Sequence, residues 1–159
     1  MSDHEQFMRR AIELARKTSL VEKSGGPFGC VIVKDGVIVA EGANTVLAHN
    51  DPTCHGEMNA IRTACKELGT HNLSGCTLYT TGEPCPMCYA ACWWARIEKI
   101  YYGSTIQDAQ QFGNFDDVPI INSLKKEIAH RTLSGEQILH EEAIQLWTDF
   151  SHSDSNIHY

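Results

Sequence analysis

Residues that can bind a metal or move a proton are concentrated in two short stretches of the chain. His55 and Glu57 are two residues apart in "DPTCHGEMNAI", and Cys85 and Cys88 lie in "TGEPCPMC". Imidazole and thiolate are ligands that zinc favours in a tetrahedral site, and a catalytic site keeps one position open for water. His55, Cys85 and Cys88 would therefore supply three ligands for a zinc ion. Glu57 is left without a ligand role.

The position of Glu57 suits a proton carrier. Zinc lowers the pKa of a bound water to roughly 7. A carboxylate within hydrogen-bond reach can then accept the proton and deliver it elsewhere. The spacing His-x-Glu followed by Pro-Cys-x-x-Cys is the signature of zinc deaminases, whereas Cys-x-x-Cys alone would be a weak signal.

Two other interpretations of the cysteine pair stay open. Cys85 and Cys88 could be half of a closed structural zinc site, in which Glu57 would be an ordinary helix residue. Four residues are available to complete such a site: His49, Cys54, His71 and Cys92. A redox pair is the weaker alternative, because nothing else in the chain resembles a thioredoxin unit.

The elements that must position these residues follow from the hydrophobic pattern. We expect a first helix over 5–18 and a hairpin over 28–42 that turns at Asp35-Gly36. The further elements expected up to Gly103 are a helix from 51–53 to Gly69, a strand over 76–80, a helix over 86–96 and a strand over 99–103. Beyond Gly103 the pattern weakens, and we expect a helix over 120–129, a strand over 136–139 and a helix over 141–150.

The order of these elements indicates one domain, 1–159, of a three-layer α/β/α class with a mixed sheet. The pair His55 and Glu57 and the pair Cys85 and Cys88 each lie at the start of a helix that follows a strand or hairpin, so both pairs can fall at one edge of the sheet. Seven cysteines, an odd number, do not suggest a disulfide framework.

The composition of the chain indicates which kinds of partner the protein can have and where in the cell it is expected. A formal net charge of −7 argues mildly against a nucleic-acid partner. No apolar run approaches the ~20 residues of a membrane span, and no signal peptide is visible. We therefore expect no membrane partner and a cytoplasmic location.

The longest patterned stretches resemble a known family. "PFGCVIVKDGVIVAEGANTVLAHNDPTCHGEMNAIRTACKELG" and "LYTTGEPCPMCYAACWWARIEKIYYG" are similar to bacterial guanine deaminases of the cytidine-deaminase-like superfamily. The resemblance extends from Phe7 to Tyr159. The zinc motifs mark only the superfamily, whereas "GGPFG", "NDPT", "FDD" and a C-terminal tyrosine are features of the guanine deaminases.

This resemblance implies a central five-stranded sheet and a reaction in which guanine and water give xanthine and ammonia. It also implies one zinc ion per subunit, held by His55, Cys85 and Cys88. Water would attack C2 of the purine, and Glu57 would move a proton first to N3 and then to the leaving amine.

The resemblance further implies a set of substrate contacts. Asn44 would hydrogen-bond the purine edge, Phe28 would stack on the base, and Asp117 would contact the guanine amino group. A homodimer is expected in which the tail, 151–159, crosses to a partner subunit and Tyr159 closes the partner's pocket.

Two residues depart from the family pattern near the pocket. Gly56 stands where guanine deaminases usually carry alanine, and Gly82 stands where the family often has a bulkier residue.

Other possible functions are a zinc deaminase of cytosine or an aminotriazine, a tRNA adenosine deaminase, and a zinc-stapled interaction module without catalysis.

Overall fold

Strand β1 (Gly29–Lys34) has both of its faces buried in the computed structural model, which describes residues 3–153 and 157–159. Cys30 and Ile32 point into one hydrophobic cluster, while Val31 and Val33 point into another on the opposite face. Alternate residues of a strand face opposite sides of the sheet. The unbroken apolar run therefore reflects a strand covered on both faces.

β1 is an inner strand of a four-stranded mixed sheet with the order β2-β1-β3-β4. The other strands are β2 (Val37–Ala43), β3 (Cys76–Gly82) and β4 (Lys99–Ser104). β1 is antiparallel to β2 and β3, whereas β3 and β4 are parallel. Asp35 and Gly36, with φ of 50° and 77°, form the turn between β1 and β2 and confirm the expected hairpin.

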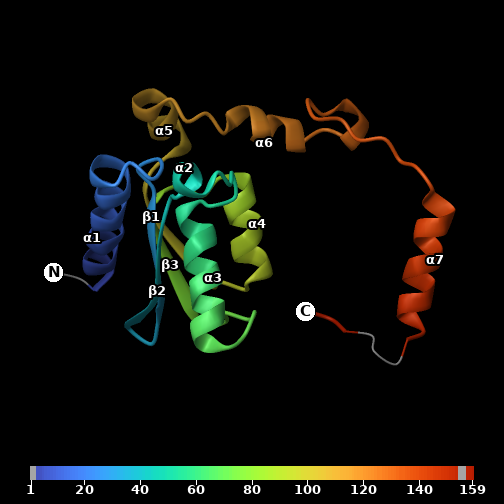
Figure 1. The fold of residues 1–159 in the computed structure, drawn as a ribbon, viewed down its shortest axis with the longest axis horizontal. Coiled ribbons are helices and arrows are strands. Elements are labelled where there is room, and N and C mark those ends of the chain that lie inside the picture. Colours follow the sequence, from blue (N-terminus) through green and yellow to red (C-terminus); the bar gives the residue numbers. More distant parts are fainter. Residues whose placement is uncertain (1–2, 154–156) are drawn as a thin grey trace. The chain divides into compact units, whose positions relative to one another are not determined.

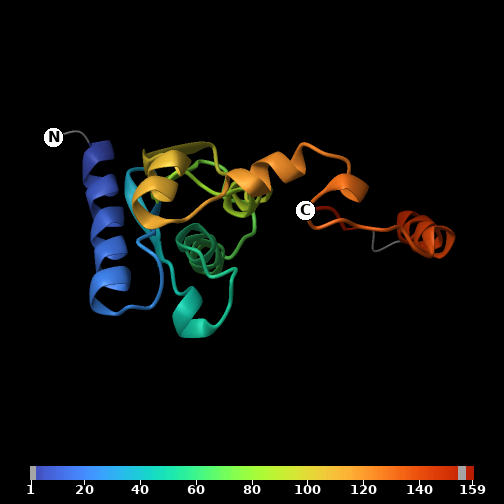
Figure 2. The same ribbon diagram turned by 90° about the horizontal axis from the view of Figure 1, so that it is seen from above.

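Helices cover the two faces of this sheet (Figures 1 and 2). α1 (Asp3–Arg16) packs on β1 and β3, and a π-helical segment, Lys17–Val21, extends it. α3 (Gly56–Leu68) packs on β2 and β1 on the other face, beside α4 (Pro86–Trp94). The arrangement confirms the expected α/β/α layers. Short helices α2 (Val46–His49) and α5 (Ile106–Gly113) follow β2 and β4.

The described residues divide into two compact units, Met1–Val118 and Pro119–Tyr159. The second unit contains α6 (Val118–Leu124, which begins at the boundary), a 3-10 turn (Ile128–His130) and α7 (His140–Ser151). None of its described residues is buried. Throughout the described part of the chain, no helix has the length and apolar character needed to cross a membrane. The expectation of a single domain over 1–159 stays a prediction.

Several expectations differ from the structure, among them the helix over 120–129, which is observed as α6 followed by a separate 3-10 turn. The five-stranded sheet is wrong for the described residues, which form four strands, because 136–139 adopt no strand. α5 was not expected, although Thr105 and Asp108 form a capping box at its start. α3 begins at Gly56 rather than at 51–53, because the Asp51 carboxylate accepts hydrogen bonds from Thr53 and forms a turn instead.

Candidate functional site

His55 and Glu57 lie at the start of α3, and Cys85 and Cys88 lie at the start of α4. His55 precedes α3 and Cys85 precedes α4, each with an extended backbone. Pro86 occupies the first turn of α4, where its missing N–H costs no hydrogen bond. α3 packs so closely on β2 that a Cβ at Gly42 would lie 2.2 Å from the carbonyl oxygen of Gly56. Close helix–strand packing thus sets the position of the His55 side chain.

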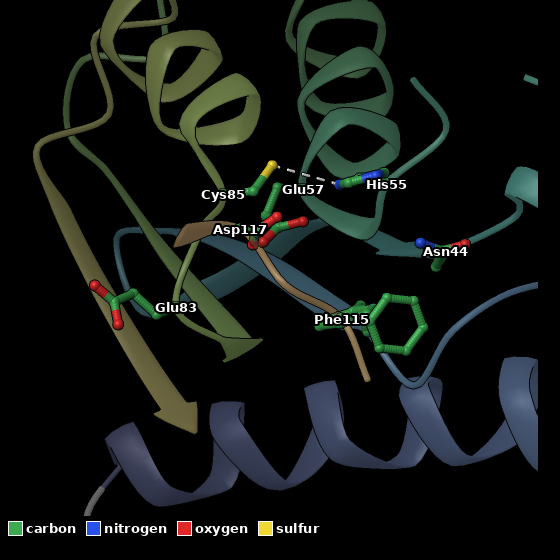
Figure 3. Close-up of a pocket in the computed structure, with 8 residues that line it drawn as sticks. Asn44, His55, Glu57, Glu83, Cys85, Phe115 and Asp117 are labelled. Atoms are coloured by element: carbon green, nitrogen blue, oxygen red, sulfur yellow. Dashed lines mark hydrogen bonds between the residues drawn. The ribbon is translucent and has the colours of Figure 1, made fainter. Parts of the chain in front are cut away.

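The structure brings three donor atoms together. The ligand atoms of His55, Cys85 and Cys88 all lie within 4.8 Å of one another. Nδ1 of His55 is 3.6 Å from Sγ of Cys85 (Figure 3) and 3.5 Å from Sγ of Cys88. Zinc bonds of about 2.3 Å to sulfur and about 2.0–2.1 Å to nitrogen, at a tetrahedral angle, separate the two atoms by about 3.6 Å. The donor set therefore fits zinc in both chemistry and spacing.

A closed four-ligand site is not supported. No fourth His, Cys, Asp or Glu joins the group anywhere in 3–153 or 157–159. All seven cysteines are free thiols, as their odd number suggested.

The three groups share protons over short distances. A hydrogen bond from Cys88 lowers the pKa of the Cys85 thiol to about 4, and the hydrogen bond to Cys85 raises the pKa of His55. The hydrogen bond to Cys85, together with burial, raises the pKa of Cys88. Metal binding must displace such shared protons, so affinity for the ion depends on pH.

Glu57 is buried directly beside this group, with 4% of its surface exposed. The hydroxyl of Thr80, which is also buried, donates to Oε1 of Glu57 at 3.1 Å. Burial raises the pKa of the Glu57 carboxyl. A carboxyl with a raised pKa binds a proton more readily than an exposed one, which suits a group that must accept a proton and return it.

A cavity of about 60 Å³ opens over these groups. Eight residues line it: Phe28, Asn44, His55, Glu57, Glu83, Cys85, Phe115 and Asp117. Of the predicted substrate contacts, Asn44, Phe28 and Asp117 therefore lie at the cavity. Tyr159 belongs to the second unit, with 73% of its side chain exposed. Of the expected tail, residues 154–156 lie outside the described residues.

Asn44 is held rigidly at the end of β2 and the loop that follows. Its backbone N–H donates to the carbonyl of Phe28 at 2.9 Å, and its carbonyl accepts from Thr18. Its amide oxygen accepts from the N–H of Val46. In Figure 3 the amide nitrogen of Asn44 points toward the other labelled residues. The side chain can thus offer a donor to an acceptor atom of a ligand.

Two aromatic rings form one wall of the cavity. Phe28 and Phe115 meet edge to face, with ring centroids 5.0 Å apart and planes at 83°. Asp117, two residues after Phe115, has its pKa raised by burial. Sequence reasoning missed Phe115, although it directly precedes the two acids of "FDD".

Sequence reasoning also missed Glu83. Its carboxylate accepts from the N–H of Ile106 at 3.1 Å, and its own N–H donates to the carbonyl of Ser104. These bonds join the end of β3 to the start of α5. In Figure 3 Glu83 lies apart from the other labelled side chains.

Comparison with known proteins agrees with this geometry. Residues 1–104 match the family described as the cytidine and deoxycytidylate deaminase zinc-binding region. The guanine deaminase of Bacillus subtilis is 45% identical over 94% of this chain and 96% of its own length. A crystal structure of guanine deaminase from Bacillus subtilis superposes with a TM-score of 0.87, at 43% identity, over 99% of this chain and 100% of that one.

A tRNA-specific adenosine deaminase of Aquifex aeolicus is 37% identical over 92% of both chains. All of these relatives carry the name of a deaminase, which agrees with a three-donor metal site beside a buried carboxylate. The chain is therefore a zinc-binding protein of the cytidine and deoxycytidylate deaminase family.

Proposed function

We propose that this chain deaminates the free base guanine to xanthine and ammonia. The observation that carries the proposal is the cluster of His55, Cys85 and Cys88 beside the buried Glu57, in a cavity lined by aromatic and amide side chains. The similarity to a guanine deaminase over nearly the full length of both chains supports the choice of substrate.

His55, Cys85 and Cys88 would hold the zinc ion. Zinc, when bound, supplies Lewis acidity that lowers the pKa of water to about 7. Cys85 and Cys88 contribute two sulfurs that balance the charge of the dication. The helix starts of α3 and α4 favour negative charge on groups at these positions.

Glu57 would carry the protons of the reaction. It accepts a proton from the attacking water, whose oxygen bonds to C2 of the purine, and passes that proton to N3. Glu57 then takes the proton of the new hydroxyl on C2 and passes it to the exocyclic amine, so that the C2 carbonyl of xanthine forms, the bond from C2 to the amine breaks, and ammonia leaves. The hydrogen bond from Thr80 holds one carboxylate oxygen in place while the other exchanges protons.

The remaining cavity residues would hold the base. Asn44 donates to an acceptor on the purine edge, Asp117 accepts from the guanine amino group, and Phe28 and Phe115 contact the ring. One water needs ~10–15 Å³ of such space. A cavity of about 60 Å³ holds only a handful of waters, which suits a flat base better than a nucleoside.

A tRNA adenosine deaminase is the second candidate, because one such relative is 37% identical over most of its length. A protein that docks on tRNA usually presents a basic surface, whereas this chain has a formal net charge of −7. Guanine therefore remains the better candidate.

Ammonia release from guanine, cytosine, adenine and guanosine, together with tRNA binding at several salt concentrations, tests these functions. We expect rapid release from guanine and none from guanosine. Tight, salt-sensitive binding of tRNA with no turnover of guanine would overturn the proposal. A matched assay of Glu57→Gln shows whether any release belongs to this site.

The second unit would act through a homodimer. Its described residues include Ile144, Leu146 and Trp147, whose side chains are 48%, 68% and 67% exposed. A segment that buries none of its described apolar side chains gains stability only by packing on another surface. We therefore infer that the tail, 151–159, is exchanged between subunits and that Tyr159 closes the partner's pocket. A cytoplasmic location stays a prediction.

Complementation tests the exchange. A Glu57→Gln chain has an intact tail but lacks the catalytic carboxylate. A chain without 157–159 keeps Glu57 but lacks the end of the tail. If Tyr159 completes the partner's site, co-refolded mixtures regain turnover that neither variant shows alone. If each tail serves its own subunit, mixtures stay as inactive as the separate variants.

A further inference from the structure

Thr80 and Thr81 are neighbours on β3, and their hydroxyl groups have different partners. Thr80 donates to the buried carboxylate of Glu57. The side chain of Thr81 lies on the opposite face of the sheet, because successive side chains of a strand alternate. Its hydroxyl forms hydrogen bonds with the backbone on both sides of Phe28. The first hydroxyl thus serves the proton carrier, and the second is bound to the loop that carries one wall of the cavity.

The hydroxyl of Thr81 continues the contact between β1 and β3 beyond the last backbone pair. The pairing of these strands reaches Cys30 of β1 and Thr80 of β3. Gly29, the next residue of β1, donates its N–H to Oγ1 of Thr81 at 3.1 Å. Gly29 is buried, and a buried N–H needs an acceptor. The side chain of Thr81 supplies one.

The same hydroxyl also donates to the carbonyl of Pro27 at 3.3 Å. It therefore binds the peptide group before Phe28 and the peptide group after it. Peptide groups are planar, so the orientation of these two planes sets φ and ψ of Phe28 and with them the direction of its side chain. The ring lines the cavity over the zinc ligands and meets the ring of Phe115 edge to face.

The peptide group between Phe28 and Gly29 connects Thr81 to a second residue of the cavity. Its N–H donates to Thr81, while its carbonyl accepts from the N–H of Asn44 at 2.9 Å. One chain of hydrogen bonds therefore runs from β3, through the start of β1, to the residue that follows β2. A displacement at Thr81 would reach both Phe28 and Asn44.

The backbone of Thr81 is fixed by the neighbouring strand β4. Its carbonyl accepts from the hydroxyl of Ser104 at 3.0 Å. The preceding residue, Thr80, is paired with Cys30 of β1 on one side and with Tyr102 of β4 on the other. The hydroxyl of Thr81 is therefore a fixed point against which the loop before β1 is held.

We propose that Thr81 is a positioning residue, whose hydroxyl fixes the peptide groups beside Phe28 and, through one of them, the backbone of Asn44. The proposal rests on the proposed function, because it takes guanine as the substrate and these two residues as its contacts. Thr81 is not among the residues that line the cavity, so it acts through its neighbours. Its effect falls on binding of the base rather than on proton transfer.

Thr81→Val and Thr81→Ser separate the hydroxyl from the shape of the side chain. Valine keeps the shape without the hydroxyl, whereas serine keeps the hydroxyl. In Thr81→Val we expect KM for guanine and the inhibition constant of xanthine to rise about tenfold, the scale of one hydrogen bond. We expect kcat to change by less than about threefold, because Glu57 and the zinc ligands are untouched. Thr81→Ser should stay within about twofold of the wild type in all three constants.

An unchanged KM in Thr81→Val would overturn the proposal. So would a Thr81→Ser variant that is as impaired as Thr81→Val, because the effect would then come from the lost methyl group or from the backbone rather than from the hydroxyl.

Thr77→Val is the matched control. Thr77 lies on the same face of β3, four residues before Thr81, and is paired with Val33 of β1. The same substitution there should leave KM and the xanthine constant unchanged. Ile32→Ala controls for stability, because it removes a buried side chain from β1. It should lower the thermal midpoint without raising KM. An equal rise of KM in either control would show a merely structural effect and overturn the proposal.

A double-mutant cycle with Phe28→Ala tests whether the effect passes through the ring. In the Phe28→Ala background, Thr81→Val should raise KM by clearly less than in the wild type, because the ring that it displaces is gone. Fully additive effects would overturn the proposal.

Thr81→Cys replaces Thr81→Val in these measurements if the valine variant does not fold. Its thiol is a weak donor and a weak acceptor, so KM should rise above that of the wild type. A wild-type KM in Thr81→Cys would contradict the role of the hydroxyl. If neither variant folds, the hydroxyl serves the fold rather than the wall of the cavity, and the proposal fails.

The wild type separates this proposal from the proposed function. A wild type that releases no ammonia from guanine overturns both. A wild type that deaminates guanine, with KM unchanged in Thr81→Val, overturns the role of Thr81 alone.

Discussion

The two units of the chain differ in what they bury. Met1–Val118 has two hydrophobic clusters, one on each face of the sheet, and its core side chains Ile32 and Leu78 are fully buried. Pro119–Tyr159 has two α-helices and a 3-10 turn but no buried residue among those described. The first unit therefore has a core of its own. The second has no such core among its described residues.

The chemistry follows the same division. All three donor atoms, Glu57 and every residue that lines the cavity belong to the first unit. Donor atoms must be held to a fraction of an ångström, which a packed core achieves and an exposed helix does not. The first unit alone therefore supplies the donor atoms and the residues that line the cavity, and the contribution that we propose for the second unit is closure by Tyr159.

Removal of the metal should have the largest effect. Dialysis against a chelator should abolish ammonia release from guanine, and added zinc should restore it. The three donor atoms of the first unit would lose the metal ion that they hold in common. The thermal midpoint of the first unit should fall as well. Metal analysis with turnover assays measures both. Full turnover in metal-free protein would contradict the assignment of the site.

Glu57→Gln should reduce kcat by roughly 10²–10⁴-fold, because it removes the proton carrier. The amide keeps the size of the side chain and can still accept from Thr80, so zinc content and fold should be retained. Glu67→Gln, an exposed acid on the same helix, is the control and should be silent. Loss of zinc in Glu57→Gln would show that Glu57 is a ligand rather than a proton carrier.

Core truncation compares the two units directly. Ile32→Ala should lower the free energy of unfolding by about 2–5 kcal/mol, because Ile32 is fully buried. Leu146→Ala, at a side chain 68% exposed, should change it by less than about 0.5 kcal/mol in dilute solution. Its effect should grow with protein concentration if α7 packs only on association. Denaturant titrations at several concentrations measure this.

If Ile32→Ala and Leu146→Ala lowered the free energy of unfolding equally at every protein concentration, the two units would not differ in how they are stabilised. It would mean that α7 is packed within its own chain and that the second unit does not depend on a partner.

The smallest effect is expected from the ion pair of Arg10 and Glu41, which ties α1 to β2 at 2.7 Å. The hydrogen bond from Arg10 lowers the pKa of Glu41 below its ordinary 4.5. The pair therefore stabilises the fold above that pH, and its contribution is lost as the pH falls through the lowered pKa. Because both side chains are about a third or more exposed, the loss should stay below about 1 kcal/mol.

Arg10→Gln should remove this part of the acid dependence of unfolding. Arg9→Gln, which breaks only the exposed pair with Glu5, should leave it in place. Denaturation curves between neutral and acidic pH compare the two variants. If the stability of Arg10→Gln fell with pH as that of the wild type does, the acid dependence of unfolding would come from carboxylates other than Glu41.

Much of the first unit could be predicted from the sequence because its signals are local. The turn at Asp35-Gly36 needs only positive φ at two residues, and Gly69 ends α3 with φ of 65° for the same reason. The spacing of Cys85 and Cys88, with Pro86 between them, predicts one thiol just before the first turn of a helix and the other on that turn. The expected strand over 136–139 failed because a short apolar run forms a strand only where a neighbouring strand is available to pair with it.

Local patterns in the chain are therefore enough to predict the types of the zinc ligands, their spacing and the apolar run that fills both faces of β1. Three contacts could be found only from the folded chain: His55 lies 3.5 Å from Cys88, the ring of Phe115 meets the ring of Phe28, and Gly82 borders the Phe28 ring. These contacts join residues far apart in the chain, and their distances depend on how closely helices and strands pack. Periodicity predicts which face of an element is buried, but packing between elements sets what that face touches.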